Sequence, residues 1–478
     1  MARAYKKKTD AYAEFLAAKT RSAPVVGMTN VPDLSPLLFP HQRDIVAWAL
    51  RKGRAAIFAD TGLGKGWIAL EWLRVLADHT GRPVLLIAPL AVSHQFVREA
   101  AKFGVDVHIA ASDDDVRETG IHVTNYHKLH KFDVTQFAAV ALDESSILKS
   151  FTSATRNLLI ESFADVPYRL ALTATPAPND FMELGNHAEF LGVMSRVEML
   201  SMFFVHDGET TQEWRLKGHA EAAFWEWCAS WAVTLRRPSD LGYDDAGYDL
   251  PPLQHEHHVI AADQREVFAA GVLFAEDAKT LAEQRGARKA TIASRVKVCA
   301  DIANATRGPV LVWCDLNDEG DALDAAIPDA VQVAGADDDA DKERRIVDFV
   351  EGRARVMVSK PSILGFGLNL QHCATVVFCG VTHSFEAYYQ AVRRCWRFGQ
   401  TRPVVVHVIS SETEGRVIEN LQRKQRDAEH MGDAMVAAMA QISRAELHAT
   451  GRTLDAYHAR HRILFPAWLV TNEEEIAA

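Results

Sequence analysis

Short apolar runs alternate with helical patterns in two separate stretches of the chain. The first stretch has four runs with the length of buried strands, at 55–60, 84–88, 138–143 and 168–173. After the first of these, apolar residues recur at helical spacing, at Ile68, Trp72, Val75 and Leu76. The second stretch has further runs at 310–314, 355–359, 375–379 and 404–409. Strands that alternate with helices are typical of parallel sheets covered by helices, so the pattern predicts two α/β lobes.

The segments outside these stretches have a different character. Residues 180–250 have few strand-like runs but several tryptophans, which predicts a helical insertion. Pro251 and Pro252 mark a boundary, because paired prolines interrupt regular structure. The predicted fold is α/β: two parallel-sheet lobes with a helical insertion between them and a helical C-terminal extension. The expected segments are an N-terminal arm at 1–35, a first lobe at 36–180, the insertion at 181–250, a second lobe at 251–414 and the extension at 415–478.

Composition and charge narrow the class of protein. The 478 residues are 48% hydrophobic and 24% charged, which is enough for ordinary globular cores. No apolar run approaches the roughly 20 residues needed to cross a membrane, and the basic start lacks the apolar core of a secretory signal. The six cysteines form no CxxC pair, so we expect reduced thiols in a cytoplasmic protein. The net charge of −11 does not indicate a nucleic-acid binder, but it is compatible with a local basic track.

A glycine-rich turn follows the first apolar run. ADTGLGKG at 59–66 joins a predicted strand to a predicted helix, and such a turn holds phosphate with its backbone N–H groups and the helix N-terminus. Gly62 and Gly64 allow close approach of the backbone, and Lys65 would reach the outer phosphates. The plain alternative is a tight turn with a chance lysine. We predict a phosphate-binding loop, and we count Thr61 and Gly66 among its nucleotide-binding residues.

Gly66 departs from the pattern of such a loop. Ser or Thr is expected directly after the lysine, where its hydroxyl holds Mg²⁺. Gly66 has no side chain, and Thr61 precedes the first glycine, so it is not a simple substitute. Either water and Asp143 hold the metal, or hydrolysis is slowed.

Two adjacent carboxylates, Asp143 and Glu144, end the third apolar run. After a buried strand and downstream of a phosphate loop, such a pair suits metal holding by the first residue and activation of the attacking water by the second. We therefore expect Asp143 to be the metal ligand. Thr173 and Thr175 end the next run, where their hydroxyls either couple the nucleotide state to the lobe interface or only complete the strand end.

The second stretch has two dense polar segments. In YYQAVRRCWRFGQTRPV at 388–404, Arg394 and Arg397 are three residues apart and share a helix face. Two guanidinium groups on one face suit contact with a phosphate chain, although a helix face paired with acids is the alternative. In SKPSILGFGLNLQHC at 359–373, two glycines and two amides suit a loop that touches nucleotide and nucleic-acid backbone. We count Gly367, Asn369 and Gln390 among the nucleotide-binding residues.

HEHH at 255–258 contains residue types that bind metals. The alternation of QHEHHVIAAD instead predicts a strand that leads into the second lobe, and we favour the strand over a metal site.

In their order along the chain, these motifs resemble those of superfamily-two helicase-like ATPases, and most of all the Swi/Snf-type branch. The resemblance covers about 38–409. LFPHQ resembles the glutamine motif that reads adenine, which implies Gln42; DTGLGKG resembles motif I; and LDESSILKS resembles the DEAH-like box. LTATPAPNDFMEL, the 359–373 segment and QAVRRCWRFGQ resemble motifs III, V and VI, with Arg394 and Arg397 as arginine fingers. APLAVSHQFVRE and VTNYHKL resemble segments that contact the nucleic-acid backbone, with Phe96 in place of the usual tryptophan.

The resemblance implies two RecA-like lobes, ATP and Mg²⁺ as cofactors, and a translocase that tracks double-stranded DNA without needing to separate its strands. Two alternatives stay open: a strand-separating DNA or RNA helicase, and a slow or non-hydrolysing nucleotide-gated DNA clamp, which Gly66 motivates. THSFEAYYQ also departs from the Trp-Asn-Pro segment usual before motif VI. We expect so compact a core to come from a bacterial or phage-infected cell.

Overall fold

A computed structural model describes residues 25–89, 92–149, 153–177, 180–206, 214–260, 288–289, 291–364, 368–380, 384–411 and 415–448. All of these residues belong to one compact unit of the chain. Gly367 and the ends of the chain, with most of the predicted N-terminal arm and the second half of the predicted extension, lie outside the described residues.

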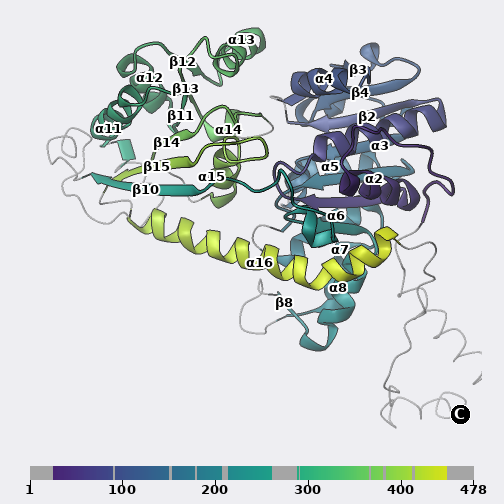
Figure 1. Ribbon diagram of the computed structural model, residues 1–478. Helices are drawn as coiled ribbons and strands as arrows, with labels where there is room; N and C mark the ends of the chain where they lie inside the picture. The colour runs from purple at the N-terminus through teal and green to yellow at the C-terminus, as the bar shows by residue number, and fades with distance from the viewer. Residues whose placement is uncertain are drawn as a thin grey trace, which may run out of the picture. The chain divides into compact units, whose positions relative to one another are not determined.

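The first lobe is built on a seven-stranded parallel sheet with the order β3-β4-β2-β5-β6-β1-β9 (Figure 1). Its strands are β1 (Arg54–Ala59), β2 (Pro83–Ala88), β3 (Val107–Ile109), β4 (Gly120–Asn125), β5 (Ala139–Asp143), β6 (Tyr168–Thr173) and β9 (Ala232–Leu235). Its helices are α2 (Pro40–Lys52), α3 (Lys65–Thr80), α4 (Ser93–Lys102), α5 (Ala154–Ser162), α6 (Leu184–Leu191), α7 (Arg196–Phe203) and α8 (Glu221–Ala229). Short 3-10 turns at Tyr126–Lys131, Ser145–Lys149 and Pro238–Leu241 connect them.

Both faces of this sheet are buried. Along β1, Ile57 packs in the core beneath α2, α3 and α4, whereas Phe58 packs on the opposite face with residues of α6 and α8. Successive side chains of a strand point to opposite faces, so a strand that is apolar throughout needs a cover on both sides. The four continuous apolar runs of the first stretch are therefore strands, as predicted, and they carry the glycine-rich turn and the carboxylate pair at their carboxyl ends.

The second lobe has a six-stranded parallel sheet with the order β10-β15-β14-β11-β13-β12. Its strands are β10 (Leu253–Ile260), β11 (Val310–Trp313), β12 (Ala330–Val333), β13 (Val356–Ser359), β14 (Thr375–Cys379) and β15 (Val404–Ser411). Its helices are α11 (Ile292–Ala305), α12 (Asn317–Ala326), α13 (Asp339–Val350), α14 (Pro361–Leu364) and α15 (Phe385–Val392). The prediction of two parallel-sheet α/β lobes is confirmed, and HEHH lies in a strand, as favoured.

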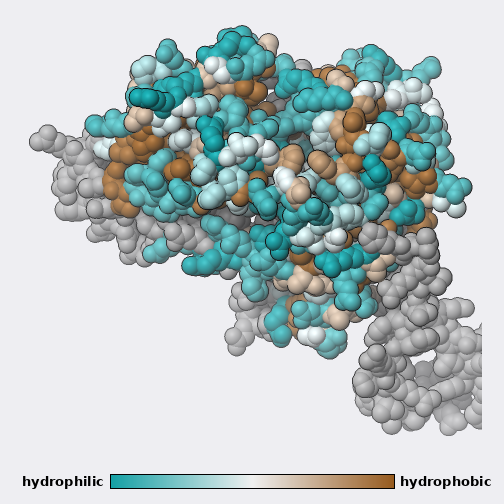
Figure 2. Space-filling model, viewed as in Figure 1, coloured by the Kyte–Doolittle hydropathy of each residue, from teal (hydrophilic) through white to brown (hydrophobic). Residues whose placement is uncertain are grey.

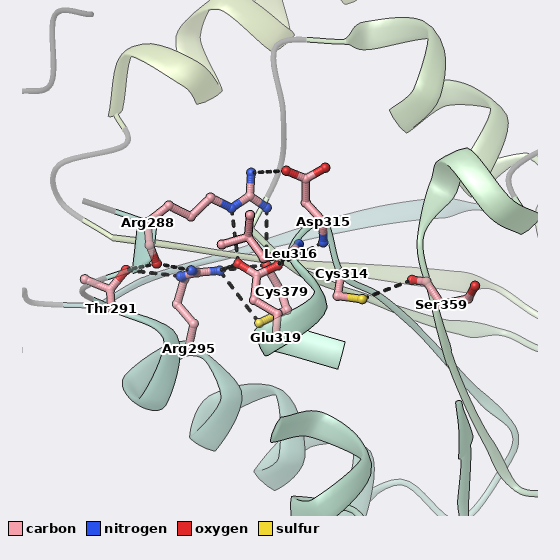
Figure 3. A network of polar contacts seen from close by, with 9 residues as sticks. All are labelled: Arg288, Thr291, Arg295, Cys314, Asp315, Leu316, Glu319, Ser359 and Cys379. Atoms are coloured by element: carbon pink, nitrogen blue, oxygen red, sulfur yellow. Dashed lines mark hydrogen bonds and ion pairs between the residues drawn. The ribbon is translucent and has the colours of Figure 1, made fainter. Parts of the chain in front are cut away.

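A buried ionic network holds the frame of the second lobe (Figure 3). Arg295, at the start of α11, pairs with Glu319 of α12 at 2.7 Å, and both side chains are fully buried. Arg295 also donates to the carbonyl of Cys379, which ends β14, at 2.7 Å. The other oxygen of Glu319 accepts from the N–H groups of Asp315 and Leu316, at 2.9 and 3.1 Å. Two helix starts and one strand end are thus joined by a charge pair whose polar atoms have several partners each, as a buried pair requires.

The segment predicted as a helical insertion, 181–250, is only partly helical. Ala232–Leu235 is β9, an edge strand of the first sheet, with Val233 opposite Ile57. Phe204–His206 (β7) and Trp214–Leu216 (β8) form an antiparallel pair. A four-residue apolar strand directly after a tryptophan-rich helix has no period of its own, which is why the sequence pattern did not separate it from the helix.

The C-terminal helix α16 (Gly415–His448) follows β15 and packs against α8, β9 and α2 of the first lobe. Met435 and Met439 are buried in the apolar core on that side of the first sheet, and Lys52 of α2 pairs with Glu446 at 3.0 Å. No helix in the described part of the chain is long and apolar enough to cross a membrane. On the face shown in Figure 2 most residues are polar, and the apolar areas are separate from one another.

Candidate active site

The glycine-rich turn between β1 and α3 has a backbone that only glycine adopts easily. Gly62 and Gly64 have φ angles of +94° and +81°, in the left-handed region. A Cβ atom on Gly64 would lie 2.2 Å from Nε2 of Gln42, and one on Gly62 would lie 2.9 Å from the backbone nitrogen of Phe398. Both glycines therefore allow neighbouring groups to approach the turn closely. This backbone conformation is the one that a phosphate-binding loop needs.

Lys65, the first residue of α3, folds back onto the turn. Its ammonium donates to the carbonyl of Ala59 at 2.8 Å and to that of Asp60 at 3.3 Å. Burial lowers the pKa of Lys65, and the nearby carboxylates of Glu144, Asp143 and Asp60 oppose this shift. A buried ammonium bonded only to neutral carbonyls still lacks an anion of its own, which is the position a phosphate would take.

Gln42 connects α2 to the turn. Its Oε1 accepts from the backbone N–H of Phe39 at 3.1 Å, and its Nε2 donates to the carbonyl of Leu63 at 3.1 Å. The side chain is almost fully buried. The residue predicted to contact adenine therefore lies directly on the predicted phosphate loop, with both ends of its amide bonded to backbone.

The carboxylate pair lies at the end of β5. Asp143 and Glu144 are each 8% exposed, and Glu144 has a φ of +53°, which is uncommon for a residue other than glycine. Burial and the adjacent Glu144 raise the pKa of Asp143, and Lys65 and Arg394 oppose the shift. The hydroxyl of Tyr126 donates to the backbone carbonyl of Asp143 at 2.6 Å. A left-handed residue turns the chain sharply here, and such strain is characteristic of functional sites.

Arg394 and Arg397 come from the second lobe; Arg394 faces Asp143 and Glu144 of the first lobe, and Arg397 lies near Glu99. Nη2 of Arg394 is 3.8 Å from Oε1 of Glu144 and donates to Oε1 of Gln390 at 2.7 Å. Nη1 of Arg397 donates to the carbonyl of Leu368 at 3.2 Å. Burial lowers the pKa of both guanidinium groups, to about 10 for Arg397, yet both stay charged at neutral pH. Arg394 is thus a buried cation beside the predicted catalytic acid, whereas Arg397 is partly buried and is held at the carbonyl of Leu368.

A second contact between the lobes holds the turn itself. Asp60, inside the glycine-rich turn, accepts from the hydroxyl of Tyr389 at 2.6 Å and pairs with Arg393 at 2.5 Å. The side chains of Asp60 and Arg393 are only 11% and 7% exposed. Removing one partner while the lobes stay together would leave an uncompensated buried charge, so in this arrangement each side chain needs the other. Neither partner was among the predicted site residues, since each is informative only when the two lobes meet.

Gly66 lies against α4. A Cβ atom there would be 3.2 Å from Cε1 of Phe96 and 3.6 Å from Oε2 of Glu99. Oε1 of Glu99 accepts from Nδ2 of Asn369, in the second lobe, at 2.7 Å. The missing side chain at Gly66 therefore makes room for an aromatic ring and brings a further carboxylate next to the predicted metal position. Nothing in the motif pattern singled out Glu99.

Several buried polar atoms in this region have no hydrogen-bond partner within the described part of the chain, among them Oγ1 of Thr61, Oε2 of Glu144, Oδ1 of Asn369 and Nε2 of Gln390. An unpaired buried polar atom costs about 1–3 kcal/mol, so such atoms are rarely grouped without a ligand. The oxygens of Thr61, Asp143 and Glu144 are the donor type that Mg²⁺ prefers. The residues present therefore fit a metal–nucleotide complex, although the hydroxyl usual at Gly66 is missing.

Glu386, on α15, connects the second lobe to two strand ends of the first. It pairs with Lys149, and it accepts from the hydroxyl of Thr175 at 3.5 Å, which is the long limit of a hydrogen bond. Thr173 accepts from the N–H of Thr175 at 3.1 Å. Of the two interpretations of these threonines, the geometry favours the one in which a hydroxyl reaches the lobe interface.

Two family profiles match the segments that contain the motifs. A family profile described as "SNF2-related domain" matches residues 41–203, and one described as "Helicase conserved C-terminal domain" matches residues 294–399. Among solved structures, the chain is similar to the Sulfolobus solfataricus SWI2/SNF2 ATPase core in complex with dsDNA, with 18% identity and a TM-score of 0.39, over 88% of this chain and 99% of that chain. No curated protein matches.

Proposed function

This chain belongs to the Swi/Snf branch of superfamily-two helicase-like ATPases, and we propose that it is a motor that couples ATP hydrolysis to movement along double-stranded DNA. The observation that carries the proposal is the convergence of both lobes on one site. Glu144 of the first lobe lies 3.8 Å from Arg394 of the second, beside the glycine-rich turn and Lys65. A site completed only when two lobes meet can convert each hydrolysis cycle into relative motion of the lobes.

In this proposal the turn at 59–66 and Lys65 bind the phosphates of ATP, and Gln42 lies near the base. Lys65 exchanges its carbonyl partners, Ala59 and Asp60, for phosphate oxygens. Asp143 would hold Mg²⁺, which neutralises phosphate charge when bound. Glu144, with one unpaired oxygen, accepts a proton from the attacking water. Arg394 and Arg397 stabilise the charge that develops on the transferred phosphoryl group.

The nucleic-acid contact is proposed for the 3-10 turn Tyr126–Lys131, which follows β4. His127, His130 and Lys131 are exposed there and Lys128 is partly exposed, so the turn supplies local positive charge on a chain whose net charge is −11. Cations that neutralise backbone phosphates provide affinity independent of sequence. A motor that moves along DNA needs such sequence-independent contacts.

A direct connection runs from this turn to the hydrolytic carboxylates. Tyr126 is the first residue of the turn, and its buried hydroxyl donates to the carbonyl of Asp143 at 2.6 Å. A shift of the turn on binding DNA would therefore move the strand end that carries Asp143 and Glu144. This contact supports the proposal that nucleic acid stimulates hydrolysis.

Gly66 favours one other function, a nucleotide-gated DNA clamp that hydrolyses slowly. The position lacks the hydroxyl that normally helps to hold Mg²⁺, and Phe96 fills the space beside it. The two functions differ in turnover: a motor hydrolyses ATP many times while bound to DNA, whereas a clamp binds ATP and holds it.

A triplex-displacement assay tests the proposal. A third strand bound in the major groove of a duplex is released when a motor moves along that duplex, even if the two duplex strands stay paired. We expect ATP-dependent release of the third strand without release of a labelled duplex strand. Release of the duplex strand would identify the strand-separating helicase instead, and no ATP-dependent release of either would contradict the motor.

A further inference from the structure

Three potential metal ligands converge at the edge of the second sheet, away from the active-site residues. Glu256 and His258 are two residues apart on β10, so their side chains point to the same face. His407, on the neighbouring strand β15, stands directly opposite Glu256 in the parallel register (Figure 1). A carboxylate and two imidazoles thus meet on one face of two adjacent strands.

The distances between the ligand atoms are those of a metal site. Nε2 of His258 lies 3.1 Å from Nδ1 of His407, and Oε2 of Glu256 lies 3.2 Å from Nδ1 of His407 and 3.9 Å from Nε2 of His258. Zn²⁺ binds imidazole nitrogen and carboxylate oxygen at about 2.0–2.2 Å, so two ligand atoms in a tetrahedral site are roughly 3.3–3.5 Å apart. Three atoms at these separations can surround one ion with small side-chain adjustments.

When both imidazoles are neutral, the three groups have few protons to share among them. Nδ1 of His407 faces the carboxylate of Glu256 and also Nε2 of His258, and one nitrogen has at most one proton to share between them. A proton on Nδ1 of His407 is then shared between two acceptors, the carboxylate of Glu256 and the lone pair of His258 Nε2. A divalent cation accepts all three lone pairs at once.

We propose that Glu256, His258 and His407 bind a divalent transition-metal ion of the Zn²⁺ type, with the remaining coordination position open to water. Two imidazoles and one carboxylate are a ligand set that Zn²⁺ uses where one position stays open. β10 is the edge strand of the sheet in the order of its described strands, and an ion held by both strands would fix it to β15. The site is independent of the ATPase, because none of its ligands belongs to the nucleotide-binding residues.

The neighbouring histidines supply a matched control. His257 lies between two of the ligands in sequence but points to the opposite face of β10, and it is exposed. His255 also points to that face, and its Nδ1 lies 2.9 Å from the hydroxyl of Tyr388. Replacing His257 removes an imidazole from the same segment without touching the proposed site.

Cobalt titration of the full chain, freed of metal by a chelator, tests the proposal. Tetrahedral Co²⁺ absorbs visible light much more strongly than octahedral Co²⁺, and Zn²⁺ should displace it. We expect one strongly absorbing Co²⁺ per chain in the unmodified protein and in His257→Ala. The strong absorption should be lost in His258→Ala and in His407→Ala, and Zn²⁺ affinity should fall at least about tenfold in Glu256→Gln.

Thermal unfolding provides a second measurement. Zn²⁺ should raise the melting temperature of the unmodified chain and of His257→Ala, and leave that of His258→Ala unchanged. The chain contains 20 histidines, so adventitious binding is the competing outcome. The proposal is overturned if the unmodified chain gives only weak octahedral absorption, or if strong absorption persists in both His258→Ala and His407→Ala.

Discussion

At the scale of single residues, Glu144 combines three features that suit a carboxylate that activates water. It is buried, its backbone is held in a left-handed conformation, and one of its oxygens has no partner among the described residues. Nη2 of Arg394 lies 3.8 Å from Oε1 of Glu144, which is too far for a strong hydrogen bond. The side chain is therefore positioned by backbone geometry, and one oxygen is available to substrate.

Replacing Glu144 with Gln should abolish hydrolysis and spare binding. The amide keeps the shape of the side chain but cannot accept the proton, and loss of a general base typically costs about 10²–10⁴ in rate. ATP affinity, measured with a fluorescent analogue, should stay within a few-fold of the unmodified chain. Lys65→Ala should weaken binding itself, because it removes the charge that faces the phosphates. Brisk turnover by Glu144→Gln would exclude Glu144 as the base.

Substitutions at Gly66 distinguish the motor from the slowly hydrolysing clamp. Gly66→Ser adds a hydroxyl where a magnesium ligand is usual, and Gly66→Ala adds only the Cβ, 3.2 Å from Phe96. If Asp143 and its neighbours already hold the metal, both variants should turn over ATP at or below the rate of the unmodified chain, because the added atoms crowd the ring. A rise of tenfold or more in Gly66→Ser, absent in Gly66→Ala, would favour the clamp.

His187 makes the first lobe sensitive to acid. It is fully buried in α6, its Nε2 lies 3.1 Å from Oγ of Ser145, and burial lowers its pKa to about 4. The unfolded chain binds a proton at this residue near pH 6.5, so the neutral side chain stabilises the fold above that pH. Its contribution, roughly 3 kcal/mol, is lost as the pH falls from about 6.5 to about 4.

Thermal unfolding between pH 7 and pH 4 checks this expectation. The melting temperature of the unmodified chain should fall across the window, and in His187→Asn it should start lower and fall less. His79→Gln, at an exposed histidine, should keep the slope of the unmodified chain. Parallel slopes in all three proteins would mean that His187 does not titrate in this range.

At the scale of elements, α15 and the residue that follows it contact the glycine-rich turn of the first lobe through Tyr389 and Arg393. The pair of Arg393 and Asp60 is nearly buried, whereas Arg98 and Glu343 form an exposed pair between α4 and α13, with side chains 52% and 39% exposed. Exposed pairs contribute about 0–1 kcal/mol, but breaking a buried pair costs about 3–5 kcal/mol.

Arg393→Met should therefore impair ATP turnover much more than Arg98→Met. The unpaired charge of Asp60 would oppose closure of the lobes, so we expect at least a tenfold loss of kcat/KM in steady-state assays. Adding Asp60→Asn to Arg393→Met should recover part of that loss, because the buried charge is gone. Equal effects of Arg393→Met and Arg98→Met would show that this contact does not control closure.

The elements themselves could largely be predicted from the sequence. Strands such as β2 and β5 are buried on both faces and therefore form continuous apolar runs that any pattern reveals. The strands β3, β9 and β12 could not be predicted from the sequence, because each is only three or four residues long and lies at a sheet edge. Lys65 could be named as a candidate from its own motif, and its role stays a prediction.

Contacts between motifs that are distant in the sequence could not be predicted from the sequence pattern. Glu99, Asp60 and Tyr389 carry no signal until α4, the glycine-rich turn and α15 are adjacent in space. The same is true of His407, which becomes a candidate metal ligand only through the register of β15 with β10. Such residues are defined by topology, which a local period does not encode.

At the scale of the whole molecule, a motor that moves along DNA requires that binding of nucleic acid changes the rate of ATP hydrolysis. Tyr126 is the proposed connection, since its hydroxyl joins the basic turn to the carbonyl of Asp143. Tyr126→Phe should keep most of the ATP turnover measured without DNA but lose most of its stimulation by DNA. Lys65→Ala should lose both. If DNA stimulates ATP turnover by Tyr126→Phe as strongly as by the unmodified chain, the hydroxyl of Tyr126 does not couple DNA binding to hydrolysis.

The most direct test of the motor is ATP turnover with duplex DNA, single-stranded DNA, RNA or no nucleic acid. We predict that duplex DNA raises kcat at least severalfold, and more than the other nucleic acids do. Rising salt should weaken this stimulation, as expected for phosphate contacts, and Glu144→Gln should show no stimulation. Turnover that no nucleic acid stimulates would contradict the account.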